Sequence, residues 1–171
     1  AADPRTRSML RESQDRVRSM ALIHEKLYQT GAERGVSFAE YARDLAAHLR
    51  HSWAGESGPV EVEVEAEEVS LDMDSSVPCG LIINELLSNA LKHAFPQGRS
   101  GRVRLGLHRA GADALVLSVS DNGVGFPPGI DVREPRTLGL RIVHILAAQI
   151  RATLELVPGE GTTITLSFPA P

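Results

Sequence analysis

The feature that most constrains the fold is a series of short predicted strands, paired by tight turns and separated by helices, after residue 59. Val60, Val62 and Val64 alternate with glutamates, which predicts a half-buried strand with its acidic side in water. Further strands are predicted at 102–108, 114–120, 152–157 and 162–168. The mixture of hairpins and helices predicts an α+β fold, a two-layer sandwich of one mixed sheet with helices on one face.

Three helices are predicted to accompany this sheet. Ser37 is expected to cap the first, which ends near Trp53, with Glu40 completing a capping box. The second is expected to begin at Pro78 and to stop before Pro96, and the third follows a glycine-rich loop. The expected buried faces are Phe38, Tyr41, Ala42, Leu45 and Leu49 in the first helix, and Leu138, Ile142, Ile145, Leu146 and Gln149 in the third.

A long helix is predicted at residues 5–29, ended by Gly31. One side of it carries a heptad-like stripe made of Leu10, Val17, Met20, His24 and Leu27. Nothing within the helix covers this stripe, so it requires a partner. We expect either self-association or packing against residues 38–49 of the same chain.

Composition narrows the class of protein. Hydrophobic residues make up 42% and charged residues 23% of the 171 residues, which is ordinary for a globular domain. A net charge of −4 does not suggest a nucleic-acid partner. A lone cysteine, Cys79, fits a reducing cytoplasm, and no apolar run is long enough to span a membrane. The first residue is alanine, so we expect sequence to be missing upstream.

Chemistry is first suggested by the predicted second helix. Glu85, Asn89, Lys92 and His93 lie at helical spacing on one stripe. Carboxylate and amide oxygens suit Mg²⁺, and an ammonium suits a phosphate group. A solvated helix face is the alternative that periodicity alone favours.

Two loops and a turn could meet the same ligand. Asp121 ends a predicted strand and can accept a hydrogen bond from an amine, while Gly123 and Gly125 allow close approach of the backbone. Residues 137–140 open a helix whose free N–H groups can bind an anion. Residues 161–163 form a turn into the last strand. Taken singly, each is also explained as an ordinary turn or helix entry.

Together, in this order, these motifs resemble the Bergerat ATP-binding fold shared by gyrase, heat-shock chaperones, mismatch-repair proteins and histidine kinases. The resemblance covers residues 60–168 and implies ATP and Mg²⁺ as cofactors. It implies that Asn89, with Glu85, holds Mg²⁺ on the ATP phosphates, and that Asp121 accepts from the adenine amine. Residues 126–137 would form a short lid over ATP. The implied ATP-binding residues are Asn89, Lys92, His93, Asp121, Gly123, Gly125, Thr137, Leu138, Gly139, Leu140 and Thr162.

Residues 12–28 and 81–90 are similar to one sensor histidine kinase group, related to the HWE kinases. The Trp-x-Glu motif of HWE kinases proper is absent. The resemblance implies a partial dimerisation and phosphotransfer helix at 1–30, a connecting helix at 31–58 and the ATP-binding catalytic domain at 59–171. It also implies a homodimer through the first helix and a response regulator receiver domain as partner.

The implied reaction is transfer of the ATP γ-phosphoryl group to a histidine, for relay to an aspartate of the response regulator. No accepting segment of the expected kind occurs in this chain. His24 lies in the apolar stripe, which favours a structural role over that of phosphoacceptor.

Three alternatives remain at this stage. Glu85 could act as general base in a gyrase-type ATPase, because a carboxylate can activate water. The chain could be a non-catalytic nucleotide-binding regulatory module. It could also be a serine kinase of the anti-sigma type, although the long first helix disfavours that.

Overall fold

The computed structural model describes residues 3–30, 36–54, 59–127, 137–157 and 159–170. The predicted stop at Gly31, most of the predicted lid at 126–137 and Pro158 of the last turn lie outside these residues.

Five strands form one mixed sheet, as the sequence predicts. They are β2 (Val60–Ala66), β4 (Gly101–Arg109), β5 (Ala114–Asp121), β6 (Thr153–Leu156) and β7 (Thr162–Pro169). Their order across the sheet is β2-β4-β5-β7-β6, with β2 parallel to β4 and every other pair antiparallel. A separate two-stranded ribbon joins β1 (Val36–Ser37) to β3 (Ser70–Leu71).

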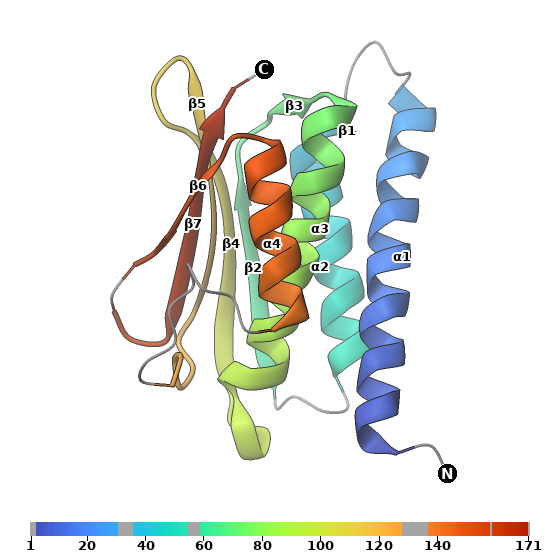
Figure 1. The fold of residues 1–171 in the computed structure, drawn as a ribbon, viewed down its shortest axis with the longest axis vertical. Helices are drawn as coiled ribbons and strands as arrows, with labels where there is room; N and C mark the ends of the chain where they lie inside the picture. The colour runs from blue at the N-terminus through green and yellow to red at the C-terminus, as the bar shows by residue number, and fades with distance from the viewer. Residues whose placement is uncertain (1–2, 31–35, 55–58, 128–136, 158, 171) are drawn as a thin grey trace.

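Four α-helices complete the described structure: α1 (Pro4–Thr30), α2 (Phe38–Trp53), α3 (Met73–Asn89) and α4 (Leu138–Gln149). A π-helical turn (Ala90–Ala94) and a 3₁₀ turn (Pro96–Gly98) extend α3. Figure 1 shows α2, α3 and α4 covering one face of the sheet, with α1 on the far side of this helical layer. The predicted two-layer sandwich is therefore confirmed, and α1 adds to it from outside.

The core lies between the sheet and the inner helices. Alternate residues of β4 and β5, such as Leu105 and Leu117, are fully buried against them. Each such side chain contributes about 1.5–3 kcal/mol when removed from water. Every residue of the predicted inner face of α2 is buried too. On the other side of the sheet, Arg104 donates to Glu63 over 2.8 Å at an exposed position, where an ion pair adds little stability.

Three local predictions are wrong. The predicted helix start at Pro78 is displaced, because Asp72 accepts a hydrogen bond from Ser75 N and starts α3 at Met73, leaving Pro78 inside the helix. Ser37 precedes α2, but its hydroxyl donates to Glu68 and makes no capping bond, so the capping box with Glu40 does not form.

The third error concerns α4, whose buried face is rotated from the predicted one. Leu140, Val143 and Ala147 face the core, whereas Leu138 and Ile145 are exposed. All these residues are apolar, so periodicity alone did not distinguish the two faces.

Helix α1 packs on α2 and α3 through a mixed face, on which Ile23 joins the apolar core and Asp15 and Ser19 are buried polar residues. The Ser19 hydroxyl lies 2.8 Å from the Tyr41 hydroxyl, and Ser52 donates to Asp15 over 3.1 Å. The described side chains of the predicted stripe point the other way: Leu10 is 57%, Val17 67% and Met20 43% exposed, and His24 is exposed as well. The side chain of Leu27 lies outside the described part of the structure. The expected packing of this helix against residues 38–49 is therefore confirmed, but another face of the helix makes it. The apolar surface of Leu10, Val17 and Met20 faces away from the domain.

Candidate nucleotide site

Two adjoining cavities lie beside α3 and the start of α4, the larger one against the sheet and the smaller one against α1. The larger has a volume of about 390 Å³ and a mainly apolar lining. It is lined by Leu86, Asn89, Ala90, His93, Ala94, Val119, Asp121, Val124, Gly125, Phe126, Pro127, Thr137, Leu140, Thr162 and Ile164. An apolar cavity with a few fixed polar groups is the usual form of a small-molecule site.

Asp121 supplies a fixed carboxylate to the wall of this cavity. It lies at the end of β5 and is only 8% exposed. Its Oδ1 accepts from Gly123 N over 2.9 Å and from Thr162 N over 3.3 Å, which fixes the carboxylate in orientation. Burial raises the pKa of Asp121, and the hydrogen bonds from Gly123 and Thr162 oppose that rise.

The glycines beside Asp121 are needed for two different reasons. A Cβ on Gly123 would lie 2.3 Å from the carbonyl oxygen of Ala94, so only glycine fits between this loop and the end of the π turn. Gly125 has a φ of +75°, in the left-handed region that glycine adopts without strain. The loop therefore depends on close backbone contact at one glycine and on unusual backbone geometry at the other.

The smaller cavity has a volume of about 130 Å³ and is rich in oxygen atoms and charge. It is lined by Glu12, Asn84, Glu85, Ser88, Asn89, Lys92, His93, Thr137, Leu138 and Gly139. Asn89, His93 and Thr137 line both cavities, so the two adjoin along these residues. Within the described residues, Asn84 Oδ1 and Ser88 Oγ are buried without a hydrogen-bond partner, so this cavity offers unsatisfied polar groups to a ligand.

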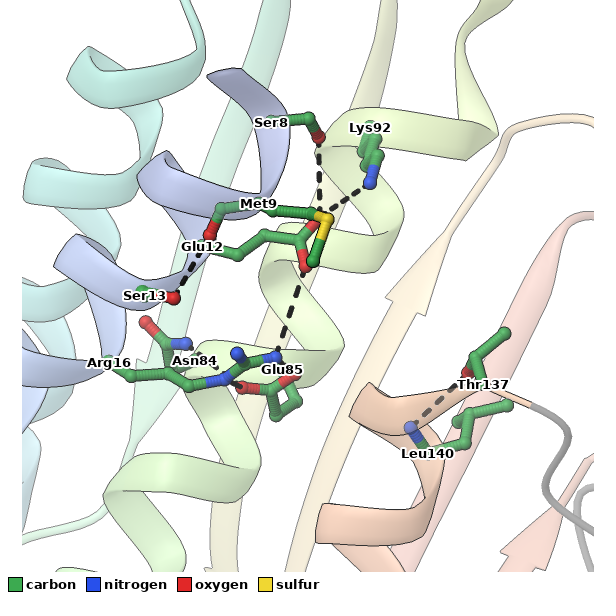
Figure 2. Close-up of polar contacts among 10 residues, drawn as sticks. All are labelled: Ser8, Met9, Glu12, Ser13, Arg16, Asn84, Glu85, Lys92, Thr137 and Leu140. Atoms are coloured by element: carbon green, nitrogen blue, oxygen red, sulfur yellow. Dashed lines mark hydrogen bonds and ion pairs between the residues drawn. The ribbon is translucent and has the colours of Figure 1, made fainter. Parts of the chain in front are cut away.

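The beginning of α4 closes the smaller cavity. Thr137 caps the helix, because its Oγ1 accepts from Leu140 N over 3.4 Å (Figure 2). A Cβ on Gly139 would lie 2.7 Å from Glu85 Oε2. The N-terminus of α4 is therefore in close contact with Glu85, which belongs to the polar stripe formed by Glu85, Asn89, Lys92 and His93. The free N–H groups of α4 can attract an anion there.

Two ion pairs join α1 to this polar stripe (Figure 2). Arg16 donates from Nε to Glu85 Oε1 over 2.5 Å and from a terminal nitrogen to Oε2 over 3.0 Å. Lys92 donates to Glu12. The hydrogen bond to Glu85 raises the pKa of Arg16 above its ordinary value. Burial would raise the pKa of Glu12, but Lys92, Ser8 and Arg16 together outweigh that effect and the pKa of Glu12 is lowered.

His93 is expected to be mostly neutral near pH 7. Burial lowers its pKa, and the neighbouring charge of Lys92 lowers it further, with partial opposition from Glu12. A neutral imidazole can accept or donate one hydrogen bond to a ribose or a phosphate.

The structure brings the predicted site residues together. All of them line one of the two cavities except Gly123, which instead orients Asp121. The sequence reasoning missed Glu12, Arg16, Asn84 and Ser88. Glu12 and Arg16 are one helical turn apart in α1, but their partners lie 80 and 69 residues away, beyond the reach of any local pattern.

Comparison with known families defines the class of protein. Residues 74–171 match the family described as histidine kinase-, DNA gyrase B-, and HSP90-like ATPase, and residues 1–53 match a second family described as histidine kinase. The chain therefore belongs to the histidine kinase-, DNA gyrase B-, and HSP90-like ATPase family, whose name implies ATP binding.

Individual relatives are sensor histidine kinases. Blue-light-activated histidine kinase 2 of Erythrobacter litoralis is 29% identical over 90% of this chain and 45% of its own length. Sensor histidine kinase PdtaS of Mycobacterium tuberculosis is 31% identical over 95% of this chain and 33% of its own length. The chain thus spans less than half the length of these relatives.

A solved structure supports the same relationship. The histidine kinase domain of the Erythrobacter litoralis EL346 blue-light activated histidine kinase superposes with a TM-score of 0.85 at 28% identity. The match covers 93% of this chain and 75% of that domain. Among the residues that the structure describes, no helix combines the length and apolarity required to cross a bilayer.

Proposed function

We propose that this chain is the ATP-binding catalytic part of a sensor histidine kinase. It would transfer the ATP γ-phosphoryl group to a histidine on another segment, for relay to an aspartate of a response regulator receiver domain. The observation that carries the proposal is the junction of the two cavities: an apolar one with a fixed carboxylate, and a polar one with amide, carboxylate and ammonium groups.

The two cavities suit different parts of one nucleotide. Asp121 can accept a hydrogen bond from the exocyclic amine of adenine, and the apolar walls can enclose the ring. Lys92, His93 and the N-terminus of α4 at Leu138 and Gly139 lie where phosphates would enter the polar cavity. Transfer of a phosphoryl group depends mainly on positioning and on neutralising charge, which these groups provide.

The polar cavity also fits Mg²⁺ on the ATP phosphates. Asn89 and Glu85 present an amide and a carboxylate to it, and Asn84 Oδ1 and Ser88 Oγ have no hydrogen-bond partner among the residues that the structure describes. Oxygen ligands of this kind are those that Mg²⁺ prefers. When bound, Mg²⁺ would neutralise phosphate charge; Asn89 would be its principal protein ligand, with Glu85 beside it.

The proposed division of the chain follows that of the sequence. Residues 1–30 would be part of a dimerisation and phosphotransfer region, 31–58 a connecting helix and 59–171 the catalytic domain. A cytoplasmic location fits a partner of the receiver-domain class. An ATPase that uses Glu85 as general base is the second candidate function, because this carboxylate lines the proposed phosphate cavity.

Incubation of the chain with γ-labelled ATP tests the kinase assignment. We expect no stoichiometric phosphohistidine, because the nucleophile is proposed to lie on another segment. Acid-labile phosphate is then mapped by mass spectrometry. Stoichiometric label on His24, which is exposed on α1, would contradict the assignment of the acceptor to another segment.

The exposed stripe of α1 is proposed to mediate a homodimer. Leu10, Val17 and Met20 leave apolar surface in water, and burying each would contribute about 1.5–3 kcal/mol. Replacing all three with serine is expected to convert a dimer into a monomer in light scattering across a concentration series. The matched control replaces exposed Ile145 on α4 with serine. An unmodified chain that stays monomeric at high concentration would contradict the proposal.

A further inference from the structure

We propose that Arg16 is a positioning residue that keeps the Glu85 carboxylate from acting as general base for a water molecule. Arg16 thereby suppresses hydrolysis of ATP by this domain. The inference rests on the proposed ATP site and deepens it, because it concerns which acceptor receives the γ-phosphoryl group. It follows from the contacts between α1 and α3 that Figure 2 shows.

Glu85 is placed where a general base for hydrolysis would be needed. It is 5% exposed, lines the polar cavity and lies against Gly139 at the start of α4. In hydrolysis, the oxygen of a water molecule would form a bond to the γ-phosphorus, and the bond from that phosphorus to the β–γ bridging oxygen would break. ADP would leave with the electron pair, and the proton of the attacking water would pass to the carboxylate.

Arg16 engages both oxygens of that carboxylate. Its two nitrogens donate to Oε1 and Oε2 in a bidentate arrangement, the strongest form of charge-assisted pair. Asn84 Nδ2 adds a further contact with Oε1 at 3.4 Å. A water molecule that used Glu85 as its base would have to displace the guanidinium, and this cost opposes hydrolysis.

The position of Arg16 is fixed by the rest of α1. Asp15 accepts from Ser52 of α2, and the hydroxyl of Ser19 lies close to Tyr41 and donates to the carbonyl of Gly80 on α3. Glu12, one turn before Arg16, accepts from Lys92. Contacts with both α2 and α3 therefore hold α1 in place, and this fixes the guanidinium of Arg16 beside Glu85.

The experiment measures steady-state phosphate release with Mg–ATP, together with calorimetric affinity, in the full chain. Arg16→Gln removes the charge while keeping similar length, and Arg18→Gln makes the same change at an exposed position of α1. Glu85→Gln and the double variant Arg16→Gln/Glu85→Gln show whether any increase in hydrolysis requires the Glu85 carboxylate. An increase caused by a less rigid structure would not require it. Arg16→Lys restores a charge without the two-pronged geometry. All are assayed at a temperature where circular dichroism shows them folded.

We expect Arg16→Gln to raise kcat for hydrolysis about tenfold, below the range of 10²–10⁴ that general bases provide, with KM for ATP unchanged. Arg16→Lys should fall between it and the unmodified chain, Arg18→Gln should match the unmodified chain, and the double variant should return to the level of Glu85→Gln.

An unchanged or reduced kcat for hydrolysis in Arg16→Gln would overturn the inference. An increase in kcat that persists in the double variant, or an effect of Arg16→Gln on KM alone, would overturn it as well. None of these outcomes would remove ATP binding by the unmodified chain, so the proposed function would still stand. Absence of ATP binding in the unmodified chain would instead remove the proposed function on which the inference stands.

Discussion

Asp121→Asn is expected to weaken binding of Mg–ATP by about 10–100-fold. A hydrogen bond to a charged group contributes about 1.5–3 kcal/mol, and each 1.4 kcal/mol is a factor of ten in affinity. The asparagine amide can also direct a donor at the adenine amine, where only an acceptor fits. Isothermal titration calorimetry at fixed Mg²⁺ concentration measures the change.

The chain provides a matched control at the opposite end of the same strand. Asp113 is exposed and immediately precedes β5, whereas Asp121 ends it. Asp113→Asn makes the same chemical change away from the cavity and should leave affinity unaltered. Equal affinity of Asp121→Asn and the unmodified chain would remove Asp121 from the adenine site.

Gly123→Ala is expected to lower both stability and nucleotide binding. The new Cβ would lie 2.3 Å from the Ala94 carbonyl oxygen and 2.4 Å from its Cβ, so backbone must move. Overpacking of this kind costs about 1–3 kcal/mol. The same movement would disturb the Gly123 N–H that orients Asp121 and the hydrogen bond from Val124 N to the Ala94 carbonyl. We expect nucleotide binding to fall about tenfold or more.

Urea denaturation measures the loss of stability, and calorimetry the loss of affinity. Gly159→Ala is the control, since a Cβ there meets no atom of the described residues within 4 Å, and surface changes of this kind usually stay within about 0.5 kcal/mol. If Gly123→Ala unfolds at the same urea concentration as the control and binds ATP normally, the close approach of the two loops is not a requirement of the site.

Local patterns predicted the sheet and most of the helices correctly. The alternation from Val60 to Val64 and the two predicted strands at 102–108 and 114–120 are properties of neighbouring residues, and they appear as β2 and the hairpin of β4 and β5. The face of α4 could not be predicted in the same way, because Leu138 and Leu140 are equally apolar. Only the packing of α4 in the folded domain, chiefly against α3, makes Leu138 exposed and Leu140 buried.

The part of the site that is built from short local motifs could be predicted from the sequence. Its motifs are short and ordered, so Asn89 and Asp121 could be named before their convergence was visible. The ion pairs of Glu12 and Arg16 could not, because they depend on how α1 docks. The apolar stripe left open whether α1 would pair with a second copy or pack on its own domain, and it did not identify the face that packs, which contains Asp15, Ser19 and buried Ile23.

Titration of the unmodified chain with Mg–ATP and Mg–GTP tests the central claim most directly. Asp121 is an acceptor and suits the exocyclic amine of adenine, whereas guanine presents a carbonyl at the same ring position. The account predicts one ATP bound per chain and GTP bound at least about tenfold more weakly, the loss expected when a buried polar group is left unpaired. Equal affinity for the two nucleotides, or no binding of ATP, would contradict it.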